Sequence, residues 1–268
     1  MSPCRALSGG RANRSTKLTQ MSSNQSSPPE VLPPPLEEAI HSVSREVLAA
    51  AASHPALNED LALSLLKRAD LPGEVLEHLS KNAAVMKSRK VKLALVAHPR
   101  TPRHVSMPVV RHLFTFDLMR VALTPVVPAD VKVVAEEVLC NRTGTISSGE
   151  KLTLAHRASG RVAAELLADA EPRVIHAALD NSRLTESHVV KAVMRSNASP
   201  ILVLAVCQHS KWSLRREVRI ALLRSQHTPM ARAVEFAASF PVPILRDILH
   251  GSRLPANARE HLLSQRNA

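Results

Sequence analysis

From Leu36 onward, apolar residues recur three or four positions apart along most of the chain. In the first such stretch, LEEAIHSVSREVLAAAA, the apolar positions are Leu36, Ile40, Val43, Val47 and Leu48. At 3.6 residues per turn these positions share one face of a helix, and the acidic residues near the start suit the positive end of the helix dipole. The pattern therefore predicts a short amphipathic helix.

Short polar breaks, often with proline, separate the apolar stretches. His54 and Pro55 end the first predicted helix, and Asn58 is suited to cap the second. Asp70 precedes a third helix, with Pro72 at its first position, where a missing N–H group leaves no helical hydrogen bond unmade. The same alternation continues to the end of the chain, and it predicts roughly fourteen to sixteen short helices.

Two stretches, VKLALVAHPRTPRHV (Val91–Val105) and VRIALLRSQHTPMAR (Val218–Arg232), have nearly the same sequence. The frame Val91, Ala94, Leu95, Thr101 and Pro102 recurs 127 residues later as Val218, Ala221, Leu222, Thr228 and Pro229. A shift of 84 residues keeps most of the frame, and shifts of −44 and +153 keep less of it. These shifts place the repeat spacing at roughly 42 to 44 residues, or twice that, a range typical of stacked helical repeats.

We interpret each repeated unit as a helical hairpin. Alanine lets two helices approach closely, while leucine and valine fill the seam between them. The Thr–Pro step is expected to start the second helix, with Thr as the cap and Pro at the first helical position. Because one hairpin cannot bury its own apolar face but a stack can, the sequence predicts an all-α fold, a right-handed α-solenoid of stacked short helical hairpins.

The chain divides by composition into two parts. Residues 1–35 are rich in Ser, Asn, Gln and Pro, which predicts a disordered N-terminal tail. We expect residues 1–20 to be a flexible extension, or to precede a true start at Met21. Residues 36–268 are predicted to form a single α-solenoid repeat domain, in which Asn141–Gly149 is the longest expected surface loop.

Composition supports helices and limits the functional classes. The chain has seven Gly, four Phe, one Trp and no Tyr, and its net charge is +12, of which the acid-free residues 1–20 supply +4. Strands favour aromatic residues, so the scarcity of aromatic residues favours helices.

The cysteines and the apolar runs indicate the compartment. Cys4, Cys140 and Cys207 lie far apart, which favours inert thiols in a reducing compartment. No apolar run reaches the roughly 18 residues of a membrane span, so we expect a cytoplasmic protein without membrane partners.

At VKLALVAHPRTPRHV, VIHAALDNSRLTESHV and VRIALLRSQHTPMAR the chain resembles the leucine-rich repeat variant and HEAT-like solenoid proteins of bacteria. These proteins carry a phrase of the type VR-x-A-L-A-x-(H/N)-P-x-(T/L)-P, and the resemblance covers about Val47 to Leu263. It implies the solenoid fold and says little about function. Some leucine-rich repeat variant proteins are associated with an iron–sulfur cluster held by clustered cysteines. This N-terminus lacks such a cluster, so no cofactor is expected.

No pattern of residues predicts catalysis or a metal site. The 13 histidines include no HExxH motif and no zinc spacing, and those at turns, such as His54, His98, His209 and His227, are expected to bond helix-end carbonyls or face solvent. Candidate acids such as Glu136–Glu137, Asp169, Glu171 and Asp180 are expected to be helix caps or solvated groups. Ser147–Lys151 lacks the spacing of a phosphate-binding loop. We therefore expect a non-enzymatic protein without a small-molecule substrate.

Clusters of basic residues are the strongest functional indication. They comprise Lys87, Arg89, Lys90 and Lys92, then Arg100 and Arg103, and finally Arg215, Arg216 and Arg219 beside Trp212. If the corresponding turns align, these cations form a stripe that suits a phosphate backbone. The alternative, that they are solvated and cover apolar surface with their aliphatic stems, has more weight. Trp212 is interpreted as a packing anchor more than as a contact for a partner.

Three functional classes remain, in decreasing order of preference. The first is a non-enzymatic scaffold whose concave surface binds another protein. The second is a solenoid that binds nucleic acid without sequence specificity through the basic stripe. The third is a solenoid enzyme, such as a HEAT-like DNA glycosylase, for which the sequence offers no catalytic constellation.

Overall fold

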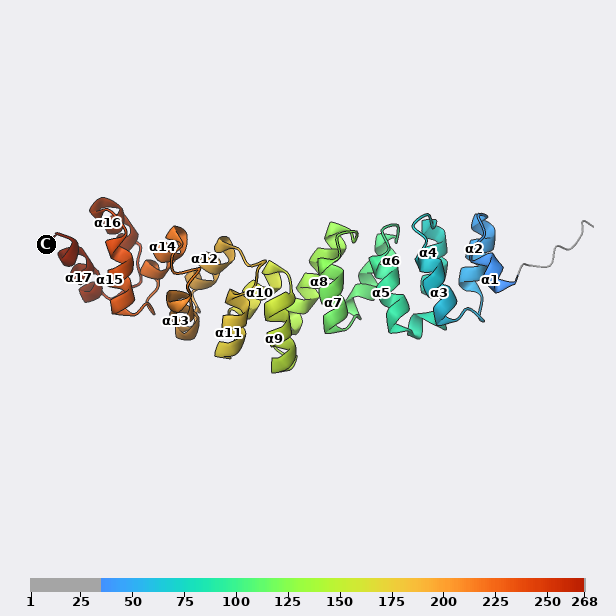
Figure 1. Ribbon diagram of the computed structural model, residues 1–268, viewed down its shortest axis with the longest axis horizontal. Coiled ribbons are helices and arrows are strands. Elements are labelled where there is room, and N and C mark those ends of the chain that lie inside the picture. The colour runs from blue at the N-terminus through green and yellow to red at the C-terminus, as the bar shows by residue number, and fades with distance from the viewer. Residues whose placement is uncertain (1–34, 268) are drawn as a thin grey trace, which may run out of the picture. The chain divides into compact units, whose positions relative to one another are not determined.

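The computed structural model describes residues 35–267, and all regular secondary structure in this range is helical (Figure 1). The all-α prediction is therefore confirmed for the described residues, with a few more helices than expected. The α-helices are α1 Leu36–Ala39, α2 Arg45–Ser53, α3 Glu59–Leu66, α4 Gly73–Lys81, α5 Arg89–Ala97, α6 Arg103–Arg111, α7 Thr115–Leu123, α8 Ala129–Arg142, α9 Ser148–Arg157, α10 Gly160–Leu166, α11 Pro172–Leu179, α12 Glu186–Met194, α13 Pro200–Gln208, α14 Arg216–Arg224, α15 Met230–Ala238, α16 Val242–His250 and α17 Ala256–Asn267. A 3-10 turn, η1 (Val85–Lys87), lies between α4 and α5.

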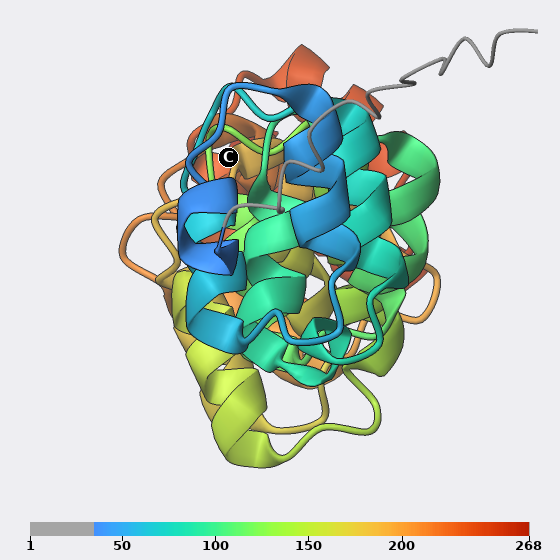
Figure 2. The ribbon, with the colours of Figure 1, turned by 90° about the vertical axis from the view of Figure 1, so that its right-hand side faces the viewer.

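The main helix–helix contacts join helices that are one or two positions apart in chain order. Contacts such as α2·α4, α6·α8, α8·α10, α10·α12, α12·α14 and α14·α16 link even-numbered helices. Contacts such as α3·α5, α5·α7, α9·α11, α11·α13 and α15·α17 link odd-numbered ones. We call these two sets the even row and the odd row. Seen from the α1 end, successive helix pairs lie behind one another (Figure 2).

Buried Leu, Val and Ala side chains between the rows form two clusters. The first contains most of the buried residues of α1 to α5, among them Leu48, Leu65 and Leu76, together with Val105 of α6. The second extends from Val96 of α5 to Leu262 of α17. Because no single hairpin could enclose such a set, the apolar faces are buried by neighbouring pairs, as the sequence pattern predicted.

The repeated Thr–Pro steps lie at turns, but the threonine and the proline have other roles than those predicted. Thr101 and Thr228 are buried, and their hydroxyls donate back to the carbonyls of Leu95 and Leu222, at 2.6 and 2.5 Å. The following prolines, not the threonines, are the N-cap residues of α6 and α15. The threonine therefore closes the helix that ends at the turn, because its hydroxyl is a second donor to a carbonyl that also accepts the N–H of the C-cap residue, His98 or Ser225.

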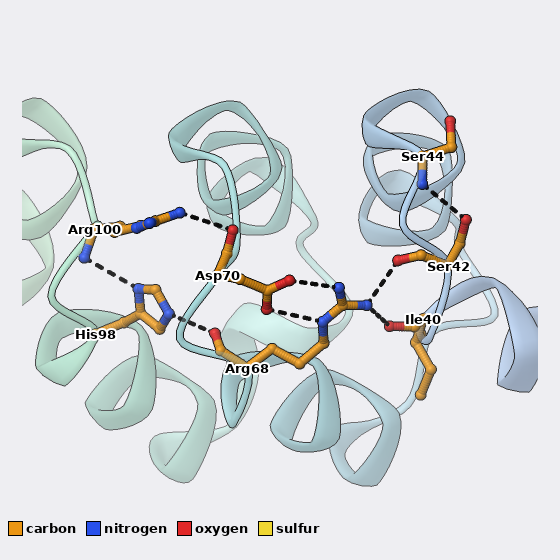
Figure 3. A network of polar contacts seen from close by, with 7 residues as sticks. All are labelled: Ile40, Ser42, Ser44, Arg68, Asp70, His98 and Arg100. Atoms are coloured by element: carbon orange, nitrogen blue, oxygen red, sulfur yellow. Dashed lines mark hydrogen bonds and ion pairs between the residues drawn. The ribbon is translucent and has the colours of Figure 1, made fainter.

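Side-chain hydrogen bonds also tie some helix ends to the turn one helix pair further along the chain, as in the network of Arg68 and His98 (Figure 3). The ring of His98 accepts the N–H of Arg100 at Nδ1 and lies 2.9 Å from the Arg68 carbonyl at Nε2. Arg68 donates in turn to the carbonyls of Ile40 and Ser42. The predicted bond from a turn histidine to a helix-end carbonyl is thus confirmed at His98.

Buried Asn181 makes the same bridge further along the chain. Its amide nitrogen donates to the carbonyls of Ala155 and Ala158, while its amide oxygen accepts the N–H of Arg183. Bonds of this kind join residues that are between 23 and 33 positions apart. The structural repeat is therefore one pair of helices of about 28 residues, as in the Arg68–Ile40 bond, and not 42 to 44 residues. The spacing of the matching segments is not a whole number of helix pairs, because α5 belongs to the odd row and α14 to the even row.

Two further expectations about the course of the chain have different outcomes. The segment Asn141–Gly149 is not a long loop, because α8 continues to Arg142 and α9 begins at Ser148, after a capping box formed by Ser147 and Glu150. The predicted disorder of the tail concerns residues that, except for Pro35, lie outside the described range. Among the described helices, none has the length and apolar character needed to cross a membrane.

An ion pair between Lys151 of α9 and Asp169, in the turn between α10 and α11, predicts that stability falls in acid. The two charges lie 2.8 Å apart, and their side chains are 19% and 11% exposed. Burial acts to raise the pKa of Asp169, but hydrogen bonds from Lys151 and from the backbone of Glu171 and Ala170 outweigh it, so that the pKa lies below its ordinary value of 3.8. The ionised carboxylate therefore stabilises the fold at pH values above the ordinary pKa of 3.8. This contribution disappears as the pH falls through the lowered pKa.

We expect Asp169→Asn to lower the free energy of unfolding at pH 7 by about 1–3 kcal/mol, because it leaves Lys151 without its counter-charge. Urea unfolding between about pH 3 and pH 7 should show this difference shrinking at the acid end. Glu137→Gln, at an exposed carboxyl on α8, is the control and should follow the parent protein. A difference that stays constant across this range would contradict the assignment.

Candidate interaction surface

The turn between α13 and α14 departs from the usual turn of the fold. Turns such as His98–Pro102 and Ser225–Pro229 run from C-cap to N-cap in five residues, whereas this one runs from His209 to Arg215 in seven. In helical repeat proteins, insertions of this kind gather at turns and often belong to the binding face. We call Lys211–Arg216 the Leu214 turn, after its most exposed apolar residue.

Trp212 anchors this turn in the core. It follows His209 by three residues, the position that Thr101 occupies after His98, and it is only 2% exposed. Its indole N–H donates to the carbonyl of Leu179 at 2.8 Å, across to the end of α11. The interpretation of Trp212 as a packing anchor therefore agrees with the structure, and its side chain is not available to a partner.

Two more side chains, those of His209 and Arg219, bind the backbone of the turn. The ring of His209 lies 3.1 Å from a carboxylate oxygen of Asp180 and accepts the N–H of Lys211. Arg219 of α14 donates to the carbonyl of Ser213 at 2.7 Å, and its guanidinium lies over the ring of Phe236. Because anchored side chains hold the turn on both sides, it presents its outer residues in one conformation.

The outer surface of the Leu214 turn combines one apolar side chain with several cations. Leu214 is 69% exposed, and Lys211, Arg215 and Arg216 are exposed around it. Among the described residues, the side chains of Arg215 and Arg216 form no ion pair. Glu217 is the carboxyl next to them in sequence. A leucine surrounded by free arginines is a contact surface that suits an acidic partner.

The first basic cluster is largely bound within the protein. Arg89 binds Asp117 of α7 through two nitrogens, at 2.5 and 3.0 Å, and its guanidinium lies 5.0 Å from the ring centre of Phe114. Lys90 pairs with Glu59 of α3 at 2.9 Å, and their hydrogen bond lowers the pKa of Glu59. These cations therefore hold α3, α5 and α7 together, which leaves Lys87 and Lys92 as the members without an ion pair among the described residues.

The next two basic residues also have partners on neighbouring helices. Arg100 donates to the carbonyl of Asp70 at 2.8 Å, and Arg103 pairs with Asp130 of α8. They follow α5, whereas Lys87 and Arg89 precede or begin it. The two groups thus lie at opposite ends of one helix of about 13 Å, at 1.5 Å per residue. Lys87 and Arg89 therefore do not share a turn with Arg100 and Arg103.

Three of the acids that sequence analysis weighed for catalysis have structural partners. Asp180 faces His209, Asp169 faces Lys151, and Glu136 lies 3.9 Å from Arg161. Within residues 35–267, no group of three or more His, Cys, Asp or Glu side chains is arranged to hold a metal ion. Burial raises the pKa of the Cys207 thiol to about 11 and also raises that of Cys140, so both thiols stay protonated and unreactive near neutral pH.

Sequence analysis missed Leu214 and Asp117. One sequence feature points to Leu214. In HSKWSLRRE the Thr–Pro step of the usual turn is replaced by Trp212 and Ser213, three and four residues after His209. Asp117 lies beyond such analysis, because its arginine partner is 28 residues away and on another helix.

Comparison of the chain with protein-family models, with curated proteins and with solved structures finds no match.

Proposed function

We propose that the chain is a non-enzymatic scaffold that binds another protein, built as a right-handed α-solenoid of the HEAT-like or leucine-rich repeat variant type. The principal support is the Leu214 turn, where an exposed leucine stands among free cations on a backbone fixed by Trp212. Such preorganisation lowers the entropy cost of binding, because the surface need not be ordered by its partner.

Two observations favour a protein over nucleic acid as the partner. A phosphate-binding stripe needs free cations, yet Arg89, Lys90 and Arg103 already pair with carboxylates on neighbouring helices. The free cations Arg215 and Arg216 adjoin an exposed leucine, which has no use against a phosphate backbone but suits the apolar centre of a protein interface.

We expect the immobilised full-length chain to capture a defined set of proteins from a nuclease-treated lysate of its own cells. Leu214→Ser and Arg215→Glu should each reduce that capture about tenfold, because central apolar and arginine contacts dominate such interfaces. Quantitative mass spectrometry of the eluates measures the effect. Lys191→Glu, an equal reversal of charge at an exposed residue of α12, is the matched control and should retain capture.

The same proteins applied to a heparin column test the alternative. Capture that disappears with nuclease, together with heparin retention that falls steeply with salt and weakens in Arg215→Glu, would replace the scaffold by a nucleic-acid-binding solenoid. Capture that is equal for all variants would remove the Leu214 turn from the proposal.

A further inference from the structure

A cavity of about 240 Å³ lies between α16 and α17, well away from the Leu214 turn in the sequence. Its polar lining includes the guanidinium groups of Arg246 from α16 and Arg259 from α17, together with the ring of His250 from α16. Another part is apolar, with Leu249 and Leu263, and Glu260 supplies a carboxylate. The cavity therefore offers guanidinium groups and apolar side chains within the space of one small molecule.

Arg259 is the unusual member of this lining. Its Nε is buried and has no hydrogen-bond partner, and among the described residues its guanidinium forms no ion pair. A buried donor without an acceptor is costly, and more so when it is charged. A bound anion at the terminal guanidinium nitrogens would supply the counter-charge that Arg259 lacks.

The polar residues that α16 contributes to the lining add to this preference. Arg246 and His250 are four residues apart on α16, so they are neighbours on one face of that helix. Neither forms an ion pair among the described residues, although Glu260 lines the same cavity. Two guanidinium groups against one carboxylate leave the cavity with a net positive charge, which favours an anionic ligand.

We propose that this cavity binds a small aliphatic carboxylate. Its oxygens would accept hydrogen bonds from Arg259 and Arg246, a pairing whose fork geometry matches a carboxylate. Its hydrocarbon part would lie along Leu249 and Leu263, where it loses contact with water. The volume suits a short chain, such as hexanoate, or the last residue of a polypeptide that ends in leucine. This site stands apart from the proposed scaffold function.

The test is a titration of the isotope-labelled full-length chain, followed by amide NMR shifts. One arm uses sodium hexanoate, and the other a Gly-Gly-Leu peptide with either a free or an amidated C-terminus. We expect saturable shifts at residues 246–263 with hexanoate or with the free-carboxylate peptide, and the tighter of the two identifies the source. Hexanol and the amidated peptide, which lack the charge, should bind about tenfold more weakly.

Variants separate this site from unspecific binding. Arg259→Gln and Arg246→Gln should each weaken binding about tenfold, and the exposed Arg246 keeps the test valid if Arg259→Gln fails to fold. Arg253→Gln is the matched control, because Arg253 is an exposed arginine between the same helices that does not line the cavity. Absence of shifts with both carboxylates, equal binding of hexanol, or binding unchanged in both variants would overturn the proposal.

Discussion

Replacing Gly160 by alanine is expected to lower the free energy of unfolding by about 3 kcal/mol, a large effect for one methyl group. Gly160 begins α10, and a Cβ atom at this position would lie 2.3 Å from the carbonyl oxygen of Arg183 and 3.0 Å from the ring of His188. The carbonyl is backbone and cannot rotate away as a side chain would. It also belongs to the turn that Asn181 holds through three hydrogen bonds.

Gly149 is a well-matched control for this substitution. It lies in the first turn of α9, it is exposed, and nothing stands within 4 Å of the added Cβ. Gly149→Ala should leave stability unchanged or raise it by up to about 1 kcal/mol, because alanine has the higher helix propensity. Urea unfolding followed by fluorescence of the single tryptophan measures both variants. If both substitutions have the same effect, α10 does not approach the turn at Arg183 as closely as described.

Much of the local structure was predictable because it depends on near neighbours in sequence. Apolar spacing and proline breaks located most helices, and Asn58 caps α3 as expected, with its side chain accepting the N–H of Leu61 at 2.9 Å. The first predicted helix is wrong in one respect, because it is divided into α1 and α2 and the intervening Val43 is exposed. Both Thr–Pro steps do lie at turns. Helix formation and capping involve residues within four positions of each other, so a sequence pattern contains the information needed.

The repeat length was not predictable from the best sequence match. VKLALVAHPRTPRHV and VRIALLRSQHTPMAR belong to α5–α6 and α14–α15, so one turn leads from the odd row to the even row and the other leads back. The same turn chemistry serves both directions, because a helix end needs the same hydrogen bonds in either row. The number of residues between two matching segments can therefore differ from a whole number of repeats by one helix, which is half a structural repeat.

The role of the basic residues was not predictable either. Arg89 and Lys90 were candidates for a shared stripe with Arg100 and Arg103, but their carboxylate partners Asp117 and Glu59 lie 28 and 31 positions away on other helices. Whether a surface cation is free for a partner depends on these distant neighbours. Sequence spacing within one helix contains no such information.

Trp212→Ala is expected to be at least as destabilising as Gly160→Ala, by about 3–5 kcal/mol, since it removes the largest fully buried side chain of the described core. Its ring fills the space between the ends of α11 and α13, and its N–H satisfies the Leu179 carbonyl. Lys211 also loses the ring above which its ammonium lies, at 4.1 Å from the ring centre. Urea unfolding followed by circular dichroism measures the loss of stability, because substitution of Trp212 removes the single tryptophan and its fluorescence.

Trp212→Phe separates the packing role from the hydrogen bond. Phenylalanine keeps most of the buried area but leaves the Leu179 carbonyl without its partner, which should cost about 1–3 kcal/mol. If the indole bond orients the Leu214 turn, Trp212→Phe should also reduce partner capture, although residue 212 is buried and Leu214, Arg215 and Arg216 are unchanged. A Trp212→Phe protein that loses stability but captures partners as well as the parent would show that packing alone fixes the turn. Equal stability of the phenylalanine and alanine variants would instead contradict the role of Trp212 as a packing anchor.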